Sequence, residues 1–71
     1  MTSNKTRLMA QFYEQCQSKG YTDMRDDTQS LKAKVIASDL GLRYGNIVEF
    51  YEKSAQCYQL IQKENAEEAE R

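Results

Sequence analysis

Histidine, proline and tryptophan are absent from this chain, and glycine occurs only three times. Without histidine, no Ser-His or Cys-His catalytic pair can form and no imidazole can bind a metal. The two cysteines are too few for a four-ligand structural zinc site. There is also no glycine-rich phosphate loop and no nucleophile with a nearby base. We therefore expect a protein that is not an enzyme and that holds neither a metal nor a cofactor.

A chain of 71 residues leaves room for a single domain over 1–71. A domain of this size buries only about 60% of the surface of its unfolded chain, and oligomerisation is a common remedy. No run of the roughly 18 apolar residues of a membrane helix occurs, and no leader-like segment follows Met1. Cys16 and Cys57 are far apart in sequence and are expected to be small buried hydrophobes in a reducing compartment. The sequence thus predicts a cytoplasmic protein with no membrane contact.

The charge is unevenly distributed along the chain. The formal net charge is −1, made up of +2 over residues 1–47 and −3 over residues 48–71. The sequence pI of 5.3 is far below the value above about 9 that is typical of basic nucleic-acid-binding domains. However, the acidic end over 64–71 lowers the pI without excluding a basic face elsewhere. This end is expected to be a solvated helix terminus.

All strong periodicities are helical, so we predict an all-α fold of three helices. The first helix, over 4–19, can be capped by Ser3 or Asn4 and ends at Gly20, which is free to adopt left-handed geometry. Its apolar stripe recurs every four residues and consists of Leu8, Phe12 and Cys16.

The second helix is predicted over 29–40, with Thr28 or Ser30 as its N-cap. Its apolar face is expected to contain Leu31 and Val35, with Ile36 and Leu40 as further candidates, and Gly41 ends it.

The third helix is the longest and is predicted over 46–66. Asn46 followed by Glu49 has the spacing of a capping box, which favours a start at Asn46. A start near Leu42 is the alternative, and the choice determines which side chains face outward.

Residues 33–52 resemble the helix-turn-helix signature of DNA-binding proteins. The small Ala37 lies where two helices would approach each other, and Gly41 follows at the turn. Ile47 and Phe50 would pack the second helix back onto the first. The resemblance covers 20 of the 71 residues. The same pattern also occurs at ordinary corners between two helices, which is the alternative interpretation.

The resemblance implies that the second helix of the motif enters the major groove of double-stranded DNA. Arginine can bond guanine and asparagine can bond adenine, while lysine reaches phosphates. The candidate DNA-binding residues are Arg43, Tyr44, Asn46, Lys32 and Lys34.

A second surface is predicted on the long third helix. Its apolar and aromatic residues approximate a heptad pattern, and shorter neighbours could leave its second half uncovered. The candidate interface residues are Tyr51, Cys57, Tyr58 and Ile61. The alternative is that the first helix covers this stripe within one protomer.

Two functions follow from these patterns. The first is a small helix-turn-helix DNA-binding regulator, expected to form a homodimer. The alternative is a helical protein-protein interaction module, an inhibitor or adaptor that does not bind nucleic acid. The net charge of −1 and the carboxylates Glu49 and Glu52 on the third helix favour the alternative.

Overall fold

The computed structural model describes residues 3–69 and contains three helices and no strand within that range. They are α1 (Asn4–Lys19), α2 (Asp27–Asp39) and α3 (Ile47–Ala69). The predicted all-α fold is therefore confirmed. The predicted acidic end over 64–71 extends past the described residues, and α3 accounts for it as far as Ala69.

The bounds of α1 agree with the prediction over 4–19. Ser3 is the N-cap, and its hydroxyl accepts a hydrogen bond of 3.1 Å from the Thr6 amide. At the other end Gly20 has a φ of 80°, and the Tyr21 amide donates to the Cys16 carbonyl at 2.8 Å. This left-handed termination satisfies carbonyls that the end of a helix leaves free.

The helix α2 begins two residues earlier than predicted, because neither Thr28 nor Ser30 is the N-cap. Asp26 takes that place, and its carboxylate accepts from the Gln29 amide at 2.9 Å. Ser30 is instead buried, with its hydroxyl donating to the Asp27 carbonyl at 3.1 Å. After the helix, Gly41 has a φ of 72°, which confirms it as the stop.

The start of α3 lies after Asn46 rather than near Leu42. The Asn46 side-chain oxygen accepts from the amides of Val48 at 2.9 Å and Glu49 at 3.3 Å, as an N-cap does. Gly45, with a φ of 58°, therefore lies outside the helix. The connection over 40–46 is longer than the three- or four-residue turn usual in a helix-turn-helix.

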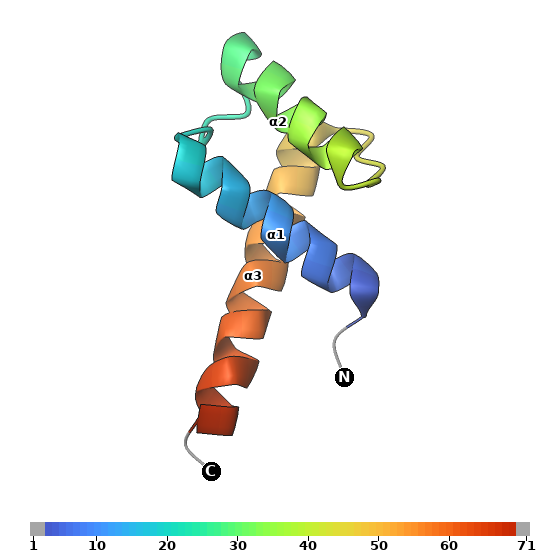
Figure 1. Cartoon of the computed structure of the whole chain (residues 1–71). Helices are drawn as coiled ribbons and strands as arrows, with labels where there is room; N and C mark the ends of the chain where they lie inside the picture. Colours follow the sequence, from blue (N-terminus) through green and yellow to red (C-terminus); the bar gives the residue numbers. More distant parts are fainter. Residues whose placement is uncertain (1–2, 70–71) are drawn as a thin grey trace.

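The core forms where α1 crosses α3, with α2 lying beside α1 over the first part of α3 (Figure 1). Phe12 is fully buried, and its ring lies edge-on to Phe50 at 5.0 Å between centroids. Ser54 is also fully buried in α3, where its hydroxyl donates to the Phe50 carbonyl at 2.8 Å. The second half of α3 extends beyond α1, which gives the molecule dimensions of 43 × 21 × 18 Å.

The predicted apolar face of α2 is wrong for Leu31 and Val35. The further candidates are confirmed, because Ile36 is buried and Leu40 packs against the core. Leu31 and Val35 are 62% and 59% exposed, whereas Ala33 and Ala37 are fully buried and Ile36 nearly so. Helical geometry explains the difference, because positions 33, 36 and 37 share one side while 31 and 35 lie on the opposite side. Small side chains on the inward side allow α2 to lie close to the rest of the core. As a result, Leu31 and Val35 face solvent, while Ile36 is the large aliphatic side chain of α2 that is buried.

Candidate functional site

Arg43 and Tyr44, two of the predicted DNA-binding residues, lie in the connection between α2 and α3. Arg43 is exposed and lines a groove of about 300 Å³ together with Lys5 of α1. Tyr44 is only half-exposed, because its ring lies 6.5 Å from that of Phe50 at the edge of the core. The structure thus brings Arg43 close to a second cation and places Tyr44 against the apolar interior.

Asn46 is held by its role at the start of α3. Its side-chain oxygen is engaged by two backbone amides, which leaves only the amide nitrogen free to donate to a ligand. The exposed side chains of the first α3 turns are Glu49 and Glu52, while Ile47 and Phe50 point inward. Lys53 follows and is also exposed, so the outward surface over these turns carries two carboxylates and one cation.

Lys32 and Lys34 lie on α2 and do not line the groove that holds Arg43. The Lys32 ammonium lies 5.6 Å from the centre of the Tyr21 ring, which is within range of a cation-π interaction. Successive residues of an α-helix are turned by about 100°, so the two lysines lie on opposite flanks of the Leu31–Val35 stripe. Lys32 is exposed and Lys34 is half-buried.

The predicted interface residues on α3 make contacts with α1 in the same protomer. The Tyr51 and Tyr58 rings lie 5.2 and 5.3 Å from the ring of Tyr13, and the Tyr51 hydroxyl accepts a hydrogen bond from Gln17. Burial, and then the nearby Tyr13, raise the pKa of Tyr51 above its usual value. Cys57 packs against the core from the edge. Much of this predicted stripe is thus covered by α1.

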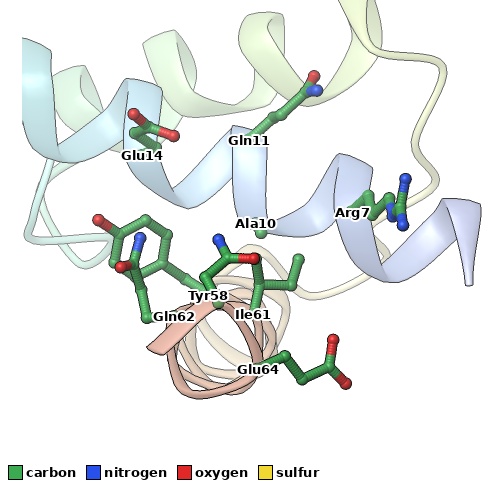
Figure 2. Close-up of a pocket in the computed structure, with 9 residues that line it drawn as sticks. Arg7, Ala10, Gln11, Glu14, Tyr58, Ile61, Gln62 and Glu64 are labelled. Carbon is green, nitrogen blue, oxygen red and sulfur yellow. The ribbon is translucent and has the colours of Figure 1, made fainter. Parts of the chain in front are cut away.

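Ile61, the last of these predicted residues, lies beside a groove of about 450 Å³ between α1 and α3. Figure 2 shows Ile61 of α3 turned toward Ala10 of α1 and the ring of Tyr58 on the side of Glu14, with Arg7 at the other side of the opening. The lining mixes both signs of charge with amides and contains little apolar surface. Nothing in this lining selects a particular ligand.

The two cysteines are both free thiols, and they differ in burial. Cys16 is fully buried, and this burial raises the pKa of its thiol to about 11, so it stays protonated at neutral pH. Cys57 is half-buried. Within residues 3–69, no group of three or more acidic or cysteine side chains is placed to hold a metal ion.

The face that sequence reasoning missed is the outward face of α2, which we define as Leu31 and Val35 with Lys32 and Lys34 on its flanks. The two aliphatic side chains lie one helical turn apart and are the two most exposed large hydrophobic residues among those described. A signal for it exists in the sequence, since Ser30, Ala33 and Ala37 form a stripe of small residues at helical spacing. Such a stripe suits a close helix-helix contact and would have turned Leu31 and Val35 outward.

No helix in the described part of the chain is both long and apolar enough to cross a membrane. No protein-family model, curated protein or solved structure matches the sequence or the fold of this chain.

Proposed function

We propose that the protein is a helical protein-binding module, an inhibitor or adaptor, which docks a partner on the outward face of α2. The observation that carries this proposal is the exposure of Leu31 and Val35, at 62% and 59%. Isolated exposed hydrophobic residues are ordinary on protein surfaces. Two of them one turn apart, on a helix whose inward side already buries Ile36 with alanine and serine, form a continuous apolar stripe.

Only one side of α2 contributes apolar surface to the core of the protomer. Burying a leucine or valine side chain fully is worth about 1.5–3 kcal/mol. The inward side buries Ile36 with the small residues Ser30, Ala33 and Ala37. The hydrophobic stabilisation available from Leu31 and Val35 is therefore left unused within the protomer. A partner that covers both side chains would gain it, in the way that amphipathic helices bind hydrophobic grooves.

The charges on the flanks indicate the chemistry of the partner. Pairing α2 with α2 of a second copy through the apolar stripe places lysine beside lysine in either orientation, because Lys32 and Lys34 flank the stripe on both sides. The repulsion disfavours self-association here. We therefore infer a different protein, with an apolar groove or helix face that offers carboxylates to the two lysines at its sides. Its ends would offer cations, because the exposed Asp27 and Asp39 lie one turn beyond Leu31 and Val35.

Affinity capture from the native host, with the full-length chain as bait, tests this function. We expect the wild type to retain a defined protein and Leu31→Asp/Val35→Asp to lose it, with the dissociation constant raised at least about 30-fold, as for loss of a central anchor. Leu60→Asp is the matched control, because Leu60 is the third large exposed hydrophobic residue and lies on α3. It should retain the same protein.

Circular dichroism establishes that each bait is folded. Retention of the same proteins by the double variant and the wild type would reject the outward face of α2 as the docking surface. The surface would also be rejected if no protein were retained by the wild type and lost by the double variant.

DNA binding by a dimeric regulator is the second candidate function. The observation that favours it is the juxtaposition of Arg43 with Lys5, in a groove with no carboxylate among its described lining residues. These two cations could contact adjacent phosphates of double-stranded DNA. Against it stand Glu49 and Glu52, which are exposed on the helix that would enter the major groove.

Fluorescence anisotropy with generic duplex DNA at low salt decides this second candidate. If DNA is the ligand, the logarithm of affinity falls linearly with the logarithm of salt concentration, by about 0.9 per phosphate engaged. Lys5→Ala/Arg43→Ala should then reduce that slope by about 2. Lys19→Ala, at the other end of α1, should leave it unchanged. Absence of binding at the lowest salt concentration rejects the DNA-binding function.

A further inference from the structure

A third surface lies where the first turns of α1 meet the solvent side of α3. It is a groove of about 490 Å³, distinct from the outward face of α2 and from the groove in Figure 2. Its apolar part comes from Met9, Cys57 and Leu60, and its cations are Lys5 and Lys53. No carboxylate occurs among its described lining residues, so the groove is amphipathic and positively charged.

The exposed side of α3 beside this groove has a simple charge pattern. Lys53, Leu60 and Glu67 are each seven residues apart, which is close to two helical turns, so they share one face. All three are exposed, Leu60 by 48%. Along this line a cation, an apolar residue and an anion follow one another at equal spacing. Between Leu60 and Glu67 lie the exposed Lys63 and the half-buried Glu64, which in the antiparallel pairing below fall opposite the uncharged Cys57 and Gln56.

This pattern is complementary to itself in only one direction. When two such helices pack antiparallel with Leu60 against Leu60, Lys53 of each lies opposite Glu67 of the other, because both are seven residues from the centre. When they pack parallel, lysine faces lysine and glutamate faces glutamate. The charges thus favour one orientation and suppress the other.

We propose that this groove is the dimer interface of the protein, and that it binds the second half of α3 from a second copy in antiparallel orientation. Leu60 lies on the two-fold axis, and two equivalent Lys53–Glu67 ion pairs flank it. Lys5, on α1, adds a further cation beside Glu67 of the second copy. Such an interface is closed and self-complementary, as two-fold contacts require. It uses the part of α3 that extends beyond α1 (Figure 1).

One leucine per copy and surface ion pairs make a small interface, so the dimer is weak. Interfaces of this kind belong to the transient class, and we expect a dissociation constant on the order of 0.1–1 mM at low salt. The proposal does not rest on the function of α2, because neither Leu31 nor Val35 takes part. The two surfaces can therefore be tested separately.

Sedimentation equilibrium of the full-length chain at low salt, up to millimolar concentration, tests this dimer. We expect Lys53→Glu to weaken association about 10-fold, because it replaces two attractive pairs by two repulsive ones. The double swap Lys53→Glu/Glu67→Lys should recover most of that loss, though not all of it, because Lys5 then faces a cation in place of Glu67. Leu60→Asp should leave the protein monomeric. Glu14→Lys is the matched control, since it changes an exposed charge of α1 that lines the other groove.

Circular dichroism verifies that the variants fold, which is expected because the substituted side chains are exposed. A wild type that remains monomeric at millimolar concentration overturns the proposal. So does a dimer that persists in Leu60→Asp, or a double swap that fails to recover most of what Lys53→Glu loses.

Discussion

Replacing Phe12 with alanine is expected to remove a large part of the protein's stability. Phe12 is fully buried where α1 crosses α3, with its ring 5.0 Å from Phe50 and 6.5 Å from Tyr51. Truncating a buried phenylalanine costs about 3–5 kcal/mol. A domain of 71 residues has a total stability of roughly 4–11 kcal/mol. The loss therefore removes a large part of the stability, and all of it if the stability lies at the low end of that range.

Urea denaturation followed by circular dichroism measures this loss. Gln11→Ala is the control, because Gln11 precedes Phe12 on the same helix and is exposed. Its free energy of unfolding should stay within about 0.5 kcal/mol of the wild type. If Phe12→Ala cost less than about 1 kcal/mol, the crossing of α1 and α3 could not be the main core.

The second large effect is expected on α2, at two adjacent positions with opposite surroundings. Ile36→Ala removes a side chain that is 6% exposed and should cost about 2–5 kcal/mol. Val35→Ala removes one that is 59% exposed and should change the stability by no more than about 0.5 kcal/mol. Alanine also has the higher helix propensity, which further limits the cost at position 35.

The same urea titration, applied to both variants, determines which side of α2 faces the core. The contrast is sharp because the two residues are neighbours in one helix and differ by a single methylene group. A larger loss for Val35→Ala than for Ile36→Ala would mean that α2 is turned the other way. In that event Leu31 and Val35 would be core residues, and the proposed docking surface would not exist.

The helix ends were predictable where one local signal dominated. Gly20 and Gly41 have no competitor for the left-handed positions after α1 and α2, and both were identified correctly. The start of α2 was misplaced because Asp26, Thr28 and Ser30 are all suitable N-caps, and the sequence does not rank them. The choice at α3 depended on whether Gly45 lies inside the helix, which only its observed φ of 58° decides.

The orientation of α2 could not be predicted from hydrophobicity alone. Leu31 and Val35 are more hydrophobic than the alanines at 33 and 37, so periodicity assigned them to the core. The structure buries Ala33 and Ala37 together with Ile36, and the two small side chains let α2 lie close to the rest of the core. The proposed docking surface on the outward face of α2 was missed for the same reason.

For the predicted DNA-binding and interface residues, the sequence does not reveal which side chains lie together in the fold. Arg43 and Lys5 are distant in the chain, and only the fold places them on one groove. Tyr51 and Tyr58 looked available on a long helix, but Tyr13 of α1 lies against both rings. The pattern of Lys53, Leu60 and Glu67 was visible in the sequence, yet its exposure follows from the way α1 crosses α3 (Figure 1).

The central claim is that the outward face of α2 binds a different protein, and site-specific photo-crosslinking in the native host tests it most directly. A photoreactive amino acid at position 31 should give an adduct with another protein, and one at position 60 should give a covalent dimer of this chain. Competition by excess wild-type protein should reduce the adduct at position 31, whereas Leu31→Asp/Val35→Asp as competitor should leave it unchanged. The claim is contradicted if position 31 forms no adduct, or crosslinks only to a second copy of this chain.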